Sequence, residues 1–205
     1  MKQKRIILAA KVMSVVFTPF YLPIVGLACL LVFTYLSLLP LMYKLYLLFA
    51  FWLFTVFIPT MLIRIYRHYQ GWSLFELGSR ERRVIPYVIS IISYMMGYYL
   101  MTAVHVPFFV CAVLIAALVI QVACAIVNLF VKVSTHMAAI GGVAGALTAF
   151  GMVFGFNPVW WLCLVLIVAG LVGTSRMVLR QHSLNEITLG FLLGTACSFA
   201  TVALL

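Results

Sequence analysis

The chain has 205 residues, of which 67% are hydrophobic and 8% are charged. Soluble domains carry roughly 25% charged residues, so this composition excludes an ordinary soluble protein and predicts an integral membrane protein. The formal net charge of +10 points to cytoplasmic loops and anionic lipid headgroups, because lysine and arginine gather there in membrane proteins. We therefore expect no nucleic-acid partner. The five cysteines stand singly in apolar runs, without the spacing of metal ligands.

Apolar runs separated by charge, proline or glycine predict the membrane-spanning helices. Each span needs about 20 apolar residues, so the whole chain, 1–205, is expected to form one all-α, polytopic transmembrane helix bundle of six or seven spans. Pro19 and Pro23 interrupt the first run, so Arg5 to Thr18 could instead lie at the membrane interface, with the first span beginning near Pro23. The predicted spans are 14–38, 45–66, 86–104, 108–131, 136–156, 158–174 and 186–205.

The charges are distributed unequally between the two faces of this bundle. Lys44 is the only lysine or arginine on the face opposite the N-terminus. The positive-inside rule then makes the N-terminal face cytoplasmic, and we expect the membrane to be a bacterial cytoplasmic membrane. The loops on the N-terminal face are 67–85, 132–135 and 175–185.

The first polar cluster on this face is the segment SRERRVIP. Arg80, Arg82 and Arg83 precede a helix that Pro86 is expected to help begin. By itself this segment indicates a solvated loop that binds lipid headgroups.

The second cluster is the segment KVSTHM, at the entry to a glycine-rich span. It contains Lys132, Ser134 and His136. Taken alone, Ser134 or Thr135 reads as a helix N-cap and His136 as an interfacial histidine. A helix N-terminus also offers unpaired backbone N–H groups and a positive dipole end, which together can hold a phosphate.

The third cluster is the segment SRMVLRQHSLNE, which contains Ser175, Arg176, His182 and Glu186. Ser183 and Glu186 fit a helix capping box, which alone would account for the glutamate. The four-residue spacing from His182 to Glu186 also places both side chains on one helical face, where the carboxylate could orient the imidazole.

The coincidence of all three clusters at one membrane face favours a common role. Arginine binds phosphate oxygens through two parallel hydrogen bonds, lysine adds a point charge, and histidine can act as a nucleophile or proton donor near neutral pH. This combination predicts a site for phosphoryl transfer at that face.

The three clusters resemble the motifs of the type-2 phosphatidic acid phosphatase superfamily, the membrane lipid phosphate phosphatases related to vanadium haloperoxidases. The third family motif is Ser-Arg, five residues, His, three residues, Asp. Here Ser175, Arg176, His182 and Glu186 have that spacing, with glutamate in place of aspartate. The resemblance extends over roughly residues 76 to 195.

The other two motifs depart further from the family pattern. The second motif, Pro-Ser-Gly-His, corresponds to the four residues from Val133 to His136, of which the serine and the histidine match. The first motif, Lys, six residues, Arg-Pro, has no Arg-Pro pair here, and Glu76 stands at the position of its lysine when counted back from Arg83. Lys132 could replace that charge from another backbone position.

The resemblance implies a role for each matching residue. His182 would attack phosphorus and form a phosphohistidine, with Glu186 orienting its ring. His136 would protonate the leaving alcohol and later help activate water. The residues expected to bind the phosphate are Arg176, Ser134, Lys132, Ser175, Arg80, Arg82 and Arg83. The family needs no metal, and we expect neither a metal nor another cofactor, since Glu76, Glu81 and Glu186 are the only acidic residues.

The expected function is a metal-independent phosphatase that acts on a lipid phosphate monoester, with membrane lipids as its surroundings. Alternatives are a polyprenyl diphosphate phosphatase, a lipid phosphotransferase, a non-catalytic protein that binds lipid phosphate, and a small transporter. Three Gly-xxx-Gly pairs, at 141–145, 151–155 and 190–194, allow close helix approach. They favour packing within the chain over the alternative of a homodimer.

Overall fold

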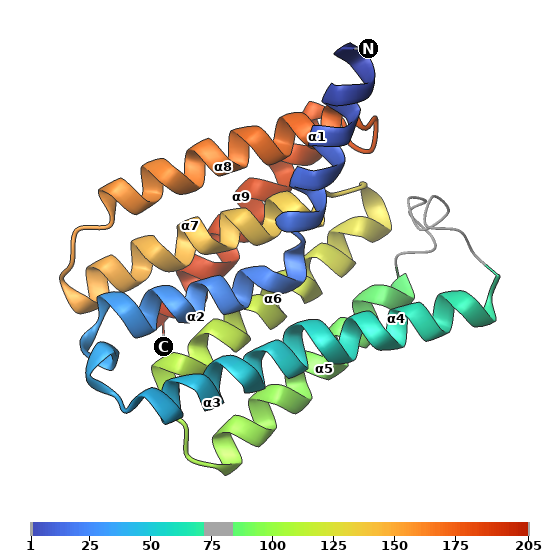
Figure 1. Cartoon of the computed structure of the whole chain (residues 1–205). Helices are drawn as coiled ribbons and strands as arrows, with labels where there is room; N and C mark the ends of the chain where they lie inside the picture. Colours follow the sequence, from blue (N-terminus) through green and yellow to red (C-terminus); the bar gives the residue numbers. More distant parts are fainter. Residues whose placement is uncertain (1, 72–83, 205) are drawn as a thin grey trace.

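The computed structural model describes residues 2–71 and 84–204, and within these ranges the regular structure is helical throughout. Helices separated by short turns fold back and forth into one bundle (Figure 1). The helices are α1 Lys2–Val16, α2 Leu22–Phe33, α3 Leu41–Trp52, α4 Ile58–Tyr69, α5 Val84–Ala103, α6 Phe108–Phe130, α7 Thr135–Phe154, α8 Val159–Val178 and α9 Leu184–Leu204.

Seven helical stretches of the described residues are long and apolar enough to cross a membrane. Two of them join consecutive helices: Lys4–Val32 contains most of α1 and of α2, and Leu41–Tyr69 contains α3 and α4. The protein is therefore an all-α, polytopic integral membrane protein, as the composition predicted. The last five predicted spans correspond to α5 through α9, with ends that differ by a few residues.

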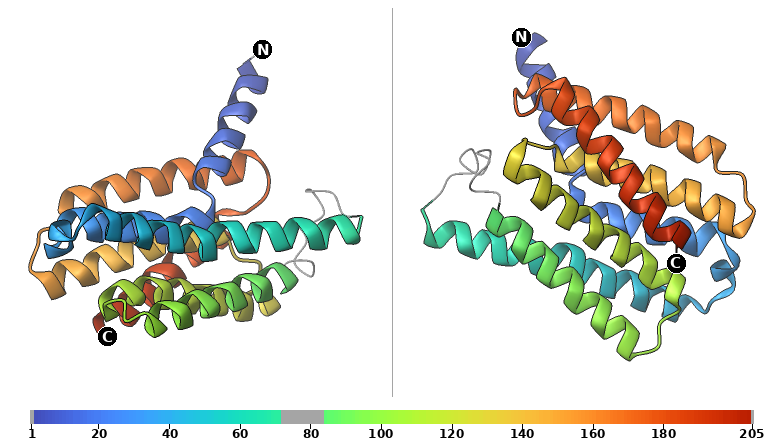
Figure 2. Two further views of the ribbon diagram at one scale, coloured as in Figure 1. Left: turned by 60° about the horizontal axis from the view of Figure 1, so that its bottom comes forward. Right: turned by 180° about the vertical axis from the view of Figure 1, so that it is seen from behind.

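The first predicted span, 14–38, is wrong as a continuous helix. The helix α1 ends at Val16, a short 3₁₀ turn follows at Pro19–Tyr21, and α2 ends at Phe33. Proline has no backbone N–H and its ring clashes with the preceding turn of a helix, so Pro19 separates α1 from α2. Figures 1 and 2 show α1 leaving the bundle at an angle, and its packing partner is α8.

The second predicted span, 45–66, is longer and is distorted in the middle. Residues Leu41–Trp52 form α3 and Ile58–Tyr69 form α4, with one π-helical turn at Leu53–Phe57 between them. A π turn inside an α-helix is a single turn with i→i+5 hydrogen bonds. The two helices run on as one long rod in Figure 1.

The connections alternate between the two ends of the bundle. The turns from α2 to α3, from α5 to α6 and from α7 to α8 lie at one end. The turns at 131–134 and 179–183 lie at the other, which we call the polar end because the second and third sequence clusters fall there. This alternation agrees with the predicted threading of the chain.

The parallel helices α7 and α9 form the most extensive helix contact in the described part of the chain. A methyl group added at Gly141 or Gly145 of α7 would come within 3.0 Å of a backbone carbonyl oxygen of α9. The same holds in the opposite direction for Gly190 and Gly194 of α9 against α7. These two Gly-xxx-Gly pairs therefore pack helices within the chain, and they fix the start of α7 against the start of α9.

The third glycine pair has a different use. Gly155 has a φ of +66° and is the C-cap of α7, a conformation that glycine adopts without steric cost. Gly151 lies against Pro158 in the turn that follows. This pair ends a helix rather than joining two.

Candidate functional site

The turn between α8 and α9 sets the distance between Arg176 and His182. The N–H of Gln181 donates to the carbonyl of Arg176 (3.0 Å), and the N–H of Arg180 donates to that of Met177 (2.8 Å). These two bonds form a Schellman motif, in which the helix ends on one residue with left-handed backbone. That residue is Arg180, with a φ of +53°. The five residues between Arg176 and His182 are the length of this helix end and its turn.

His182 and Glu186 form a hydrogen-bonded pair, in which the histidine is buried and the glutamate is partly exposed. The imidazole Nδ1 lies 2.6 Å from a carboxylate oxygen of Glu186, and the side chains are 1% and 22% exposed. The helix α9 begins one residue after Ser183, whose Oγ accepts from the N–H of Glu186 (3.4 Å). The serine half of the capping box is thus present, while the carboxylate turns to the imidazole. The hydrogen bond at Nδ1 fixes the orientation of the ring, so that Nε2 is the nitrogen on the side away from Glu186.

Ser134 links the start of α7 to the start of α9. Its N–H donates to the carbonyl of Glu186 (3.2 Å), and its own carbonyl accepts from Ala138 in the first turn of α7. The residue is fully buried, and its hydroxyl oxygen has no hydrogen-bond partner among the described residues. Buried polar atoms almost always have a partner, and this hydroxyl departs from that pattern.

The helix α1 supplies a residue that joins Arg176 to His136. A guanidinium nitrogen of Arg176, Nη1, donates to the hydroxyl of Ser14 at 2.6 Å. The Nε2 atom of His136 lies 3.1 Å from the carbonyl oxygen of Ser14 and 3.5 Å from its hydroxyl oxygen. Sequence reasoning missed Ser14, because a single serine in an apolar run has no distinguishing pattern.

Two other residues that were predicted to bind phosphate donate to backbone carbonyls instead. The ammonium of Lys132 donates to the carbonyl of Gln181 (2.7 Å), so it ties the turn after α6 to the turn that precedes His182. The hydroxyl of Ser175 donates to the carbonyl of Leu171 within α8 (2.8 Å), which directs it to its own helix. The arginines predicted from the first motif, Arg80, Arg82 and Arg83, lie outside the described residues.

The structure therefore brings most of the second and third clusters together at the polar end. Arg176, His136 and Lys132 supply positive or protonatable groups, and Glu186 is the only acidic residue of the described ranges. Arg176 is 9% exposed and His182 is 6% exposed. Water screens charges less at such depth than at the surface of the protein.

No family model, no curated protein and no solved structure matches this chain. The resemblance to the lipid phosphatases therefore rests on the sequence motifs alone. We call the group formed by Ser134, His136, Arg176, His182 and Glu186 the candidate site.

Proposed function

We propose that this protein is a membrane-embedded, metal-independent phosphatase that hydrolyses a lipid phosphate monoester through a phosphohistidine intermediate. The observation that carries the proposal is the hydrogen-bonded pair of His182 and Glu186, with 2.6 Å between Nδ1 and the carboxylate. His182 follows the turn that begins at Arg176. An oriented imidazole can act as a nucleophile, and a guanidinium at the same end of the bundle can bind phosphate oxygens.

The reaction would proceed in two displacements. In the first, Nε2 of His182 attacks phosphorus, the P–N bond forms, and the ester P–O bond breaks as His136 gives a proton to the leaving alcohol. In the second, His136 accepts a proton from water, the water oxygen attacks phosphorus, and the P–N bond breaks to release inorganic phosphate. Arg176 and the backbone N–H groups at the start of α7 would stabilise the charge on the phosphoryl oxygens.

Substrate binding requires an exchange of partners at Ser14. In the structure this serine occupies Nη1 of Arg176 and Nε2 of His136, the two atoms that the mechanism assigns to the phosphate and the leaving oxygen. The phosphate oxygens would replace the serine oxygens, which requires α1 to shift from α8. Among the α1 side chains that the structure describes, only that of Ala10 is buried. Little apolar contact therefore opposes that shift.

The exchange at Ser14 yields a prediction for substrate affinity. Ser14→Ala removes the hydroxyl that competes for Arg176, so we expect KM to fall by about fivefold, equivalent to about 1 kcal/mol for one hydrogen bond, with little change in kcat. Steady-state kinetics of the purified variant would measure both constants. A rise in KM would contradict the competition and show that Ser14 helps to bind the substrate.

The membrane placement of this function is part of the proposal. We assign the polar end to the cytoplasmic face of a bacterial cytoplasmic membrane, because the lysines and arginines concentrate on that side. Lys4, Arg5 and Lys11 are exposed on α1, where they could meet anionic headgroups of the same leaflet. The substrate would then reach the site from within that leaflet.

The first experiment measures phosphate release by the purified protein in mixed micelles that contain EDTA. The panel consists of lipid monophosphates, polyprenyl diphosphates and p-nitrophenyl phosphate. We expect release from a lipid monophosphate to survive the chelator. Preference for a diphosphate, or transfer to an added alcohol, would favour the related alternatives. Absence of release and transfer with every compound would overturn the proposal in favour of a binding protein.

The role of His136 predicts a dependence on the leaving group. His136→Ala should slow release from an alkyl phosphate by roughly 10²- to 10³-fold, the range expected for loss of a general acid. With p-nitrophenyl phosphate, whose leaving group needs no proton, we expect one rapid equivalent of nitrophenolate per protein, followed by slow turnover. Rapid mixing would resolve this burst. An equal loss of the first step for both esters would contradict the acid role of His136.

A further inference from the structure

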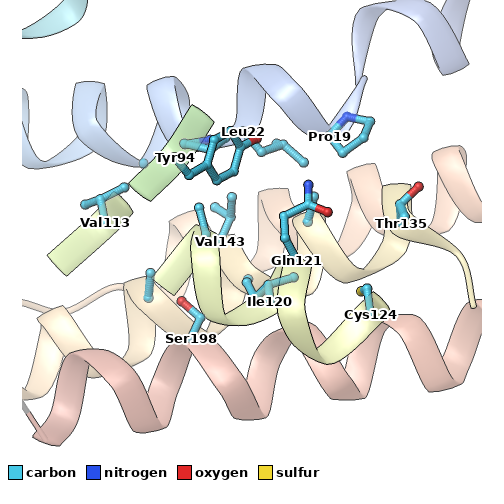
Figure 3. Close-up of a pocket in the computed structure, with 16 residues that line it drawn as sticks. Pro19, Leu22, Tyr94, Val113, Ile120, Gln121, Cys124, Thr135, Val143 and Ser198 are labelled. Carbon is cyan, nitrogen blue, oxygen red and sulfur yellow. The ribbon is translucent and has the colours of Figure 1, made fainter. Parts of the chain in front are cut away.

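An apolar pocket lies between α2, α6 and α7, and one end of it is at the first turn of α7 (Figure 3). Its empty volume is about 540 Å³, which includes open solvent at its mouth. Thr135, which stands between Ser134 and His136 in the sequence, lines it from α7, and Pro19 lines it from the turn that precedes α2. The pocket therefore connects the first turn of α7 with the interior of the bundle.

A second pocket of about 350 Å³ continues the first along α7. Gly26, Val143 and Ala146 line both pockets, and the second reaches Phe150. At 1.5 Å per helical residue, Thr135 and Phe150 are about 22 Å apart along α7, which is most of the hydrocarbon core of a bilayer, about 30 Å thick. We call the two pockets together the α2/α7 groove.

Short side chains keep this groove open. Thr135, Ala139, Gly142 and Ala146 line it from α7, and their spacing places them on one face of that helix. On the opposite wall, a Cβ added at Gly26 would lie 3.4 Å from the side chain of Val113 on α6. The walls are largely apolar, and Gln121 is a polar exception whose amide is visible in Figure 3.

We propose that the α2/α7 groove binds one hydrocarbon chain of the substrate while the candidate site holds the phosphate. This inference rests on the proposed function and adds the part of the substrate that the motifs do not define. Apolar walls favour a hydrocarbon over water, and the groove begins at the first turn of α7, where the phosphate would bind. A second chain, in a lipid that has two, would remain in the bilayer.

The test blocks the groove where its two pockets meet. Ala146→Phe places a ring at that point, and Ala196→Phe places the same ring at an exposed position of α9. The substrates are hexadecyl phosphate and butyl phosphate in the same mixed micelles. We expect Ala146→Phe to lower kcat/KM for hexadecyl phosphate at least tenfold and to leave butyl phosphate within twofold, while Ala196→Phe changes neither. Equal losses for both esters, with both variants folded by thermal unfolding, would overturn the inference.

A second measurement does not depend on turnover. Hexadecyl phosphate with a photoactivatable diazirine at the chain end would be cross-linked to the protein, and the labelled peptides identified by mass spectrometry. We expect labels on α2 and α7 that disappear in Ala146→Phe and remain in Ala196→Phe. Labels that persist in both variants would overturn the groove assignment. Absence of phosphate release from wild type would instead refute the proposed function, and cross-linking would still decide whether a chain occupies the groove.

Discussion

Replacing His182 with alanine is expected to reduce phosphate release by about 10⁴-fold or more, since the proposed pathway loses its nucleophile. His182 is buried with its Nδ1 held by Glu186 at 2.6 Å, so no neighbouring side chain of the candidate site can take the same position. The measurement is phosphate release by wild type and variant at equal concentrations, with thermal unfolding to establish that both are folded.

The phosphohistidine gives this prediction a direct chemical readout. Wild type quenched in alkali after brief exposure to a ³²P-labelled lipid phosphate should retain label that acid releases, as an N–P bond does. His182→Ala should retain none. Label that persists in this variant would contradict the assignment of His182 as the nucleophile, even if activity were lost.

Glu186 provides a graded control for the same pathway. Glu186→Gln preserves the size of the side chain and removes its charge, so the positive charge that develops on the His182 ring as Nε2 attacks phosphorus loses its stabilisation. We expect a loss of roughly 10²-fold or more in kcat. Glu186→Asp restores the charge on a shorter side chain and should recover part of the activity. A Gln variant with full activity would show that Glu186 serves only as a helix cap.

The parts of the site that sequence reasoning predicted are those set by local geometry. His182 and Glu186 are four residues apart, and any helix that begins near them brings their side chains together. The sequence motif predicted the spacing between Arg176 and His182, but it did not predict the turn that produces this spacing. The structure shows a Schellman turn with Arg180 at the left-handed position, where glycine is the usual residue, so no sequence signal marked this helix end.

The parts that were missed depend on contacts between distant segments. Ser14 and Arg176 are 162 residues apart, and nothing near Ser14 in the sequence distinguishes it from a serine that packs in a membrane helix. The first predicted span failed for a related reason. Apolar composition indicates how long a hydrophobic run is, whereas Pro19 sets the angle between α1 and α2. That change of direction is what brings Ser14 to the polar end.

The α2/α7 groove was equally invisible to sequence reasoning. Alanine and glycine at a helical spacing on α7 could pack against a neighbouring helix or line an open space. On the side of α7 that faces α9, the backbone of α9 occupies the space beside Gly141 and Gly145. On the side that faces α2, Ala139 and Ala146 line the groove. Only the placement of the neighbouring helices distinguishes these two uses.

A single methyl group at Gly194 is expected to destabilise the bundle strongly. The added Cβ would come within 3.0 Å of the carbonyl oxygen, carbonyl carbon and Cα of Ala138, all of which are backbone atoms that cannot move aside as a flexible side chain can. The helices α7 and α9 would have to separate. We expect Gly194→Ala to lower the free energy of unfolding by ~3 kcal/mol, at the upper end of the range for overpacked cores, as measured by thermal and denaturant unfolding in detergent micelles.

The matched control is Gly170→Ala on α8, where an added Cβ meets nothing within 4 Å. Alanine has a higher helix propensity than glycine by up to ~1 kcal/mol, so this variant should unfold at or slightly above the wild-type temperature. A Gly194→Ala protein as stable as Gly170→Ala would contradict the close α7–α9 crossing.

Gly190→Ala connects this packing with the candidate site. Its Cβ would lie 2.6 Å from the carbonyl oxygen of Ser134, the residue whose N–H donates to the carbonyl of Glu186. Separation at this point would move the start of α7 from the start of α9, and with it His136 from His182. We therefore expect Gly190→Ala to lose phosphatase activity at temperatures where it is still folded. The shared crossing of α7 and α9 thus predicts two separable results. Gly194→Ala should lower the stability of the bundle, and Gly190→Ala should displace the start of α7, which carries Ser134 and His136, from the start of α9.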